Sequence, residues 1–368
     1  MAKKSAKKTT KKAARATSAT EDRGTTMPTD AAPGMRILSI DGGGMLGIMT
    51  TVYLAELERE LGGDLRDHFD IIAGTSTGSI LAAAVAMGLK ADAIQELYWN
   101  RGSHIFKKSV LDFFGRTFTE GVSRPEYNEE NLGEELQRQF TDGGEEVRFG
   151  DLKPLVMITA YETHCRQAKV FKNDRDKYKD LPVWELVKAS SSAPTYFAPH
   201  PLTIPGDVEP GVCSREDKCL VDGGVFANNP SACAVAEALR INNQRPEEER
   251  FNTSDFVVAS FGNGRHTRSL PYDSVKEWGK SEWIIPLISV MMDGDQDTAT
   301  YIAKQIVGEQ QFFRFDTRLD RGMDDMDNAT KTNLSQLLSV ARDYIRSRDN
   351  QQRIKDLAQK VRLAAWHD

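Results

Sequence analysis

The sequence predicts an α/β fold of three layers, in which helices cover both faces of a mostly parallel central sheet. Short apolar runs that end in glycine-rich turns alternate with segments whose apolar residues recur at helical spacing. Strands separated by helices form parallel sheets, because each crossover helix packs on a face of the sheet. The length of 368 residues, of which 39% are hydrophobic, fits one large globular domain or two smaller ones.

The first elements follow one another closely. The run "MRILSI" (35–40) ends in "DGGG" and predicts a strand that enters a tight turn. Residues 47–61 place apolar groups at helical spacing. Residues 69–74 predict a second strand, and residues 77–89 predict the helix that follows it.

The rest of the chain continues this alternation. The further expected elements are strands at 155–161, 218–224 and 255–264 and helices at 183–190, 230–241, 283–307 and 333–362. Residues 104–150 contain two aromatic patches and many charges but no clear strand, so we interpret them as an inserted cap. We expect one catalytic domain at 35–346, with 347–368 as a C-terminal helix that packs on it or extends it. The acidic run "DGDQD" (293–297) lacks the glycine of a calcium loop and is interpreted as a solvated helix interruption.

Residues 1–34 are expected to be a disordered basic tail. Residues 1–16 hold six Lys, one Arg and no acidic residue, although the whole chain carries a net charge of −6. A tract of Lys, Ala and Thr cannot bury enough apolar surface to offset the entropy of ordering. It lacks the apolar centre of a secretory signal. The tail offers a contact for anionic lipid or nucleic acid, and a solubilising role explains it equally well.

The cysteines and the hydropathy indicate the cellular compartment. Four cysteines (Cys165, Cys213, Cys219 and Cys233) in a chain of this length do not predict a disulfide scaffold. Cys213 and Cys219 lack the second ligand pair of a zinc site. The longest run of small and apolar residues, 80–89, is too short to span a bilayer. We therefore expect a soluble, cytoplasmic protein without a bound metal.

The glycine loop at 41–47 exposes backbone N–H groups at the start of a helix, where proteins bind anions. Gly42, Gly44 and Gly47 match the dinucleotide fingerprint G-x-G-x-x-G. That fingerprint also requires an acidic residue at the end of the second strand. The second strand ends instead in "AGTSTG" (73–78), so the nucleotide interpretation lacks its second requirement.

That strand end carries a G-x-S-x-G motif, Gly74 to Gly78, between a predicted strand and a predicted helix. Such a turn is so sharp that the residues two positions before and two positions after the serine need almost no side chain. It raises the Ser76 hydroxyl above the sheet, beside the positive end of the following helix. A serine nucleophile also needs a base and donors for a transient oxyanion. Asp222, at another strand end beside two glycines, is the candidate base.

The motifs "DGGG" (41–44), "GTSTG" (74–78) and "DGGVFANNP" (222–230), with "SSSAPTYFAP" (190–199), resemble the patatin-like phospholipase family over about residues 35–346. The resemblance implies the patatin-like three-layer sandwich. It also implies a Ser–Asp dyad that hydrolyses acyl esters of glycerolipids without a metal or another cofactor.

Carried onto this chain, the resemblance implies that Ser76 is the nucleophile and Asp222 the base that acts on it directly. The amides of Gly42, Gly43 and Gly44 then form the oxyanion hole. Plain turn chemistry and orientation of the Asp222 loop explain the two asparagines at 228 and 229 equally well.

One departure concerns Leu46, where family members usually carry Arg or Lys in D-G-G-G-x-R-G. The change removes a positive charge near the oxyanion loop and puts the rate or the headgroup preference in doubt. The segments 69–94 and 286–306 are similar to bacterial patatin-like effectors of antiphage signalling that cyclic nucleotides switch on. The resemblance thus implies a phospholipase A-type enzyme, peripheral at the inner membrane, with a cyclic nucleotide activator and a homo-oligomer as further partners.

Two alternatives remain open. Ser76, Asp222 and His266 follow the chain order of an α/β-hydrolase triad, in which His266 is the base and Asp222 orients it. The second alternative is a non-catalytic signalling module whose glycine loop binds a phosphate or a nucleotide.

Overall fold

A computed structural model of the chain describes residues 34–105, 125–209, 211–265, 269–320 and 322–364. The expected basic tail lies outside these residues except for Gly34, and so do residues 106–124 of the expected cap. His266 also lies outside them.

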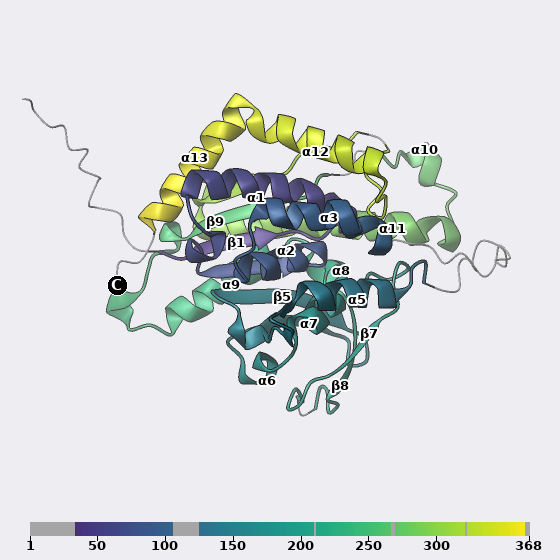
Figure 1. Cartoon of the computed structure of the whole chain (residues 1–368), viewed down its shortest axis with the longest axis horizontal. Coiled ribbons are helices and arrows are strands. Elements are labelled where there is room, and N and C mark those ends of the chain that lie inside the picture. Colours follow the sequence, from purple (N-terminus) through teal and green to yellow (C-terminus); the bar gives the residue numbers. More distant parts are fainter. Residues whose placement is uncertain (1–33, 106–124, 210, 266–268, 321, 365–368) are drawn as a thin grey trace, which may run out of the picture. The chain divides into compact units, whose positions relative to one another are not determined.

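A central sheet of eight strands is the middle layer of the fold (Figure 1). The strands are β1 (Arg36–Ile40), β2 (Ile71–Thr75), β5 (Leu155–Glu162), β6 (Gln167–Lys172), β7 (His200–Thr203), β8 (Asp217–Asp222), β9 (Val257–Phe261) and β10 (Phe312–Phe315). Their order is β10-β9-β1-β2-β5-β8-β7, with β6 also paired to β5. The five strands from β10 to β5 are parallel, whereas β6, β7 and β8 pair antiparallel.

Helices fill most of the connections between strands. They are α1 (Gly47–Leu61), α2 (Thr77–Ala86), α3 (Ala91–Ile105), α5 (Glu129–Gln139), α6 (Asp176–Lys179), α7 (Val183–Ser191), α8 (Gly224–Ala227), α9 (Ser231–Asn243), α10 (Tyr272–Val275), α11 (Lys280–Val307), α12 (Lys331–Arg346) and α13 (Arg348–Leu363). A small hairpin of β3 (Thr141–Asp142) and β4 (Glu145–Glu146) follows α5.

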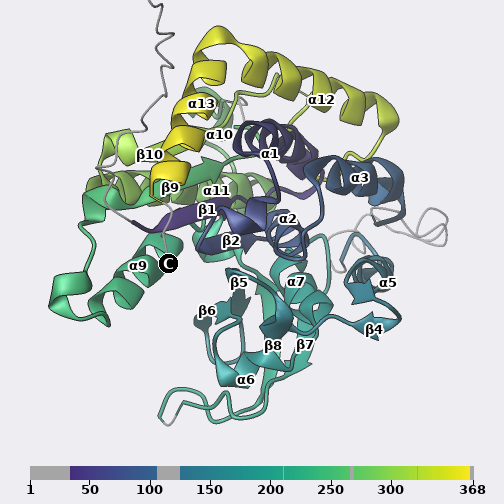
Figure 2. The ribbon, with the colours of Figure 1, turned by 60° about the vertical axis from the view of Figure 1, so that its left-hand side comes forward.

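Both faces of the parallel strands are buried, because side chains alternate across a strand. On β1, Leu38 belongs to a core cluster with α1, α12 and α13, whereas Ile37 belongs to a cluster with α9 and α11. Figure 2 shows α1, α12 and α13 together on one side of the strands. Two-sided burial explains why these strands read as continuous apolar runs in the sequence, and the predicted three-layer α/β class is confirmed.

Most predicted elements form where the apolar pattern places them, with four exceptions. The expected helix at 333–362 is two helices, because Ser347 leaves the helical conformation and its side chain accepts from Asn350 N to start α13. The expected interruption at 293–297 is wrong, since these residues lie inside α11. Within the expected cap, the described residues form α5 and the β3–β4 hairpin. The pattern also missed α3 and the three short or half-exposed strands β6, β7 and β10.

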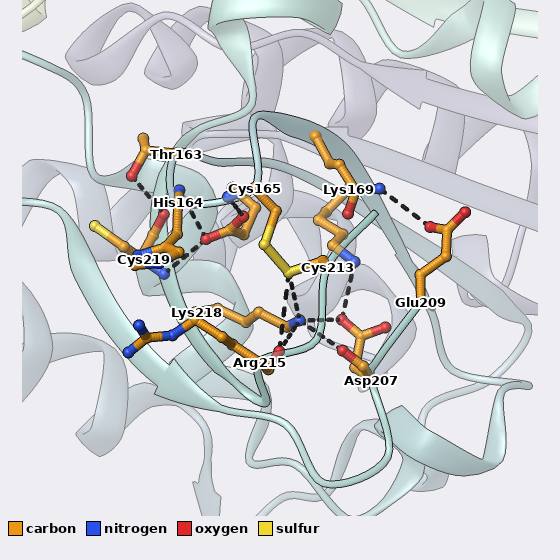
Figure 3. Close-up of a disulfide and its surroundings, with 12 residues drawn as sticks. Thr163, His164, Cys165, Lys169, Asp207, Glu209, Cys213, Arg215, Lys218 and Cys219 are labelled. Carbon is orange, nitrogen blue, oxygen red and sulfur yellow. Dashed lines mark hydrogen bonds and ion pairs between the residues drawn. A yellow bond between two sulfur atoms is a disulfide. The ribbon is translucent and has the colours of Figure 1, made fainter. Parts of the chain in front are cut away.

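The cysteine expectation needs one correction, because Cys165 and Cys213 form a disulfide. Cys165 lies in the turn between β5 and β6, and Cys213 lies in the loop between β7 and β8 (Figure 3). The antiparallel pairing of β5 with β8 brings the two loops together, so that the Cα atoms lie 5.5 Å apart. Spacing along the sequence could not show this contact. Cys219 and Cys233 are free thiols.

A buried lysine lies beside the disulfide. Lys218 Nζ is 3.7 Å from Cys213 Sγ and donates at 2.6 Å to the carbonyl oxygens of Asp207 and Arg215 (Figure 3). Burial raises the pKa of the Asp207 carboxyl, but hydrogen bonds from Lys177 and Lys169 outweigh burial and lower it to about 2. Buried charges of opposite sign therefore hold the β7–β8 loop against the sheet. Among the described helices, none is both long enough and apolar enough to cross a bilayer.

Candidate active site

Ser76 stands at a strained turn between β2 and α2. Its φ is 53° and its ψ is −126°, a conformation that side-chain-bearing residues rarely adopt. A Cβ on Gly74 would lie 2.2 Å from Gly78 O, and one on Gly78 would lie 2.3 Å from Ile40 O. The motif therefore requires glycine at both flanks, and its turn lifts Ser76 from the sheet at the start of α2.

Asp222 lies at the end of β8, close enough to Ser76 for the Ser76 side chain to lower the pKa of the Asp222 carboxyl. Its carboxylate accepts from Gly224 N at 2.7 Å. Burial raises the pKa of Asp222 to about 6, although the Ser76 side chain and the Gly224 N–H lower it. The carboxyl group is thus ionised at neutral pH and close to the titration point that suits a general base.

The sheet brings these two residues together end to end. Residues 157–162 of β5 pair with β6 along one edge, so β2 and β8 share the other edge. Thr75 pairs with Thr159, and Asp222 pairs with Ala160, the next residue of β5. Strand β2 ends where the antiparallel β8 ends, so the chain delivers a hydroxyl and a carboxylate to one point from opposite directions.

The glycine loop lies on β1, the strand next to β2. A Cβ on Gly42 would lie 3.1 Å from Ser76 Cβ, so the loop is in contact with the turn that carries Ser76. Gly42 N donates to Asn228 O at 3.0 Å. Within the described residues, the N–H groups of Gly43 and Gly44 make no hydrogen bond, and both glycines line the same cavity as Ser76.

Residues 190–192 form hydrogen bonds with both Ser76 and Asp222, a role that the sequence pattern did not predict. Ser190 Oγ accepts a hydrogen bond from Ser76 N at 2.8 Å. Ser192 O accepts from Asp222 N at 3.0 Å. The C-terminal end of α7 therefore connects the backbone of Ser76 to that of Asp222. Three adjacent serines before a proline were the available signal, and they carry no chemistry that points to this function.

A buried ion pair supports the start of the glycine loop. Arg314, on the edge strand β10, contacts Asp41 at 2.6 Å and Asp316 at 2.9 Å. Burial raises the pKa of Asp41 to about 7, and the Arg314 guanidinium opposes that rise. Leu46, in contrast, is buried in the apolar core with α1. The cation beside this loop therefore comes from β10 in this chain.

An apolar cavity opens at Ser76 and Asp222. Most of its lining is hydrophobic: Met45, Ile80, Leu97, Tyr98, Ile105, Leu132, Leu136, Phe197, Val225, Ile288, Met291, Met292 and Met326. Arg101, Glu135 and Gln139 add polar groups to the wall. The arrangement suits a substrate with a long apolar portion whose reactive group lies beside Ser76.

Asn229 holds the turn after Asp222 through its side chain, and within the described residues neither asparagine side chain bonds to the Asp222 carboxylate. Asn229 Oδ1 accepts from Ser231 N, and Asn229 N donates to Asp295 Oδ2 at 2.9 Å. Asn228 contributes its carbonyl oxygen to Gly42, and within the described residues its side-chain amide has no hydrogen-bond partner. The acidic run in α11 therefore holds the 228–229 turn by a hydrogen bond to Asp295.

Among the described residues, one group has metal-ligand types close together: Glu162, Cys165 and Cys213. Two of its members are joined as a disulfide, and Glu162 accepts from the backbone N–H groups of His164, Cys165 and Cys219. These atoms are already engaged in the fold and lie apart from the lining of the Ser76 cavity.

Comparisons with known proteins agree with this geometry. A sequence model described as patatin-like phospholipase matches residues 38–235. Patatin-like protein 1 of Arabidopsis thaliana is 29% identical over 86% of this chain and 83% of its own length. A cGAMP-activated phospholipase of Vibrio cholerae is 28% identical over 84% of this chain and 89% of its own length. A cGAMP-activated phospholipase of Escherichia coli is 33% identical over 56% of this chain and 57% of its own length.

The family match covers more than half of the chain and includes the glycine loop, the nucleophile elbow and Asp222. The chain therefore belongs to the patatin-like phospholipase family and is a lipid acyl hydrolase.

Proposed function

We propose that this enzyme cleaves acyl esters of glycerophospholipids, as a phospholipase A-type hydrolase, with a Ser76–Asp222 dyad. The observation that carries the proposal is the proximity of the Ser76 side chain to the buried Asp222 carboxylate, in an apolar cavity that both residues line. A serine needs a base in direct contact, and Asp222 has the geometry and the raised pKa for that task.

In the first step, Asp222 accepts the Ser76 proton while Oγ attacks the ester carbonyl carbon. The tetrahedral intermediate then expels the lysolipid oxygen, which takes the proton from Asp222. The acyl group remains on Ser76 as an ester. In the second step, Asp222 removes a proton from water, which attacks the carbonyl carbon of that ester. The second tetrahedral intermediate expels Ser76 Oγ, which takes the proton from Asp222, and the fatty acid is released.

The oxyanion of each intermediate needs donors fixed in advance. The N–H groups of Gly43 and Gly44 supply them, because they line the cavity and make no hydrogen bond within the described residues. Gly42 acts differently: its N–H donates to Asn228 O and fixes the loop against the turn that follows Asp222. No step of this scheme needs a metal or another cofactor.

The direct test uses substitutions at the three candidate positions. Ser76→Ala and Asp222→Asn should each abolish hydrolysis of a fluorogenic phospholipid, and Ser76→Ala should abolish labelling by a fluorophosphonate. His266→Ala should retain activity near wild type. Loss of all activity in His266→Ala would favour the Ser76–Asp222–His266 triad over the dyad.

The names of two relatives support a finer proposal, that a cyclic nucleotide activates this enzyme and that it acts in antiphage defence by degrading the membrane. The test is fluorophosphonate labelling of Ser76 with and without cGAMP. Labelling that rises with cGAMP supports a switched enzyme, whereas equal labelling supports a constitutive one. A function that Ser76→Ala retains in full would favour the nucleotide-binding module instead.

The proposal places the enzyme in the cytoplasm, peripheral at the inner membrane when it is active. Residues 35–346 form its catalytic domain, and α13 buries Ile354, Leu357 and Val361 against the core that contains α1. The basic residues 1–34 are proposed to contact anionic surfaces, and removal of this tail should then weaken binding to anionic vesicles at low salt.

A further inference from the structure

The N-terminal half of α11 has an exposed apolar side. The sequence from Trp283 to Met292, "WIIPLISVMM", contains no charged residue. Within it, Leu287 is 47% exposed, Val290 44% and Met291 47%. These three positions, with Trp283, recur at intervals of three and four residues and therefore follow one side of the helix. Soluble proteins rarely leave such a stripe uncovered unless it contacts a partner.

Two tryptophans lie next to this stripe. The rings of Trp278 and Trp283 meet edge to face with centroids 5.2 Å apart. Together with Lys280 and Leu287 they line a shallow hollow. Tyr272, at the start of α10, is 76% exposed. Trp and Tyr beside a lysine are typical of segments that lie in the interfacial layer of a bilayer, where an aromatic ring meets acyl chains and an ammonium meets phosphate.

The stripe is continuous with the catalytic cavity. Met291 is exposed and also lines the cavity that contains Ser76 and Asp222, as do Ile288 and Met292 on the same helix. A lipid that leaves a bilayer contacting this stripe can therefore enter the cavity without its acyl chain crossing water. This continuity selects a bilayer as the occupant.

We propose that Trp278, Trp283, Leu287, Val290 and Met291, here called the docking stripe, insert into the interfacial layer of a phospholipid bilayer and open the cavity toward it. Lys280 lies where it meets a lipid phosphate. This inference rests on the proposed lipid substrate of the site. Figure 1 shows α10 and α11, the two helices that carry the stripe and its neighbours.

The experiment measures vesicle binding in the Ser76→Ala background, so that no lipid is consumed. Vesicles contain equal parts of phosphatidylglycerol and phosphatidylcholine, and binding is measured by co-flotation. Leu287→Asp and Val290→Asp should each weaken binding at least about tenfold, because each side chain loses the transfer free energy of a buried Leu or Val. Ile302→Asp is the matched control, since Ile302 is 41% exposed on the same helix but lies about four turns from Leu287.

A second readout locates the inserted side chains. Vesicles with brominated acyl chains should quench the fluorescence of Trp278 and Trp283, and Phe substitution of both should remove most of the quenching. The proposal is overturned if the fraction of Leu287→Asp that co-floats with vesicles equals the fraction of its Ile302→Asp control. It is also overturned if the stripe proves to be a contact with a second copy, which Leu287→Asp would reveal by halving the particle mass while leaving flotation intact.

A soluble short-chain ester separates this proposal from the proposed function. For this assay the variant keeps the native Ser76. Leu287→Asp should hydrolyse p-nitrophenyl butyrate like wild type and lose activity only on vesicles. If wild type hydrolyses no ester either with or without cGAMP, the proposed function fails while the flotation result stands. If wild type hydrolyses both substrates and Leu287→Asp changes neither, the docking stripe fails alone.

Discussion

The backbone N–H of Ser76 donates a hydrogen bond to the Ser190 hydroxyl oxygen over 2.8 Å. Both residues are buried, and Ser76 holds a positive φ at this point. A strained backbone persists only where its surroundings determine it. The Ser190 hydroxyl is therefore part of what holds Ser76 in this conformation.

Ser190→Ala removes the acceptor and leaves a buried N–H unsatisfied, at a cost of about 1–3 kcal/mol. We expect kcat on a soluble ester to fall while KM changes little, because the substitution moves the nucleophile and not the cavity wall. Ser192→Ala is the matched control, since its hydroxyl donates to Lys188 O in the same segment. Equal kcat values for the two variants would contradict a positioning role for Ser190.

Activity should fall as the pH decreases through about 6. Asp222 acts as a base only when it is ionised, and burial raises its pKa from the usual value near 4 to about 6. Below that pH, kcat/KM should drop about tenfold per pH unit. The acid limb should persist in His266→Ala, because the titrating group is Asp222. A limb that disappears in His266→Ala would show that the histidine titrates instead.

Local sequence patterns were sufficient to predict the elbow and the glycine loop. Each is a short strand that enters a glycine-rich turn, and the clashes that make those glycines necessary involve near neighbours, such as Gly74 with Gly78. The parallel pairing of β1 with β2 then follows from the connecting helix. These parts of the site needed no long-range information.

The other parts of the site depend on pairings that the sequence does not encode locally. Asp222 was identified as a strand-end carboxylate. However, β8 is antiparallel to β5 and pairs with it just beyond the residues that pair with β2, along the same edge. Arg314 lies on a four-residue strand too short to show a pattern, and it contacts Asp41 from 273 positions away. Such contacts are set by tertiary packing.

Arg314→Met should destabilise the protein strongly. Arg314 faces Asp41, which is fully buried, and Asp316, which is nearly so. Removing this cation leaves the buried Asp41 carboxylate unpaired, whereas Asp316 keeps its ion pair with Arg265. The loss of one partner of a buried pair costs about 3–5 kcal/mol. Urea unfolding followed by circular dichroism measures the change in the free energy of unfolding.

Arg36→Met is the control for that measurement, because Arg36, on β1, pairs at 2.7 Å with Asp70, whose side chain is 25% exposed. A more exposed partner recovers more hydration when the pair is broken, so we expect a smaller loss of stability from Arg36→Met. If the two substitutions have equal effects, the Arg314 cluster contributes no more than this half-buried pair.

The disulfide should stabilise the fold without serving catalysis. Cys165 and Cys213 are 48 residues apart, and closing a loop of that length removes entropy from the unfolded chain worth about 4 kcal/mol. The Cys165→Ala, Cys213→Ala double variant should unfold at lower urea concentration than wild type. Its kcat/KM on a soluble ester should stay near wild type, because the dyad lies at the other end of the β5–β8 pairing.

Two thiols, Cys219 and Cys233, should react with an alkylating reagent in the unfolded, unreduced protein, and all four cysteines should react after reduction. A reductant should lower the urea midpoint of wild type by breaking the disulfide. Cys219→Ala, on the same strand as Lys218, is the control, and a reductant should lower its midpoint by the same amount. Glutathione keeps most cytoplasmic thiols reduced. The number of cysteines alkylated in intact cells therefore also tests the proposed cytoplasmic location. Four alkylated cysteines from intact cells, with two from the purified protein, would mean that the bond forms only after the enzyme leaves the cytoplasm.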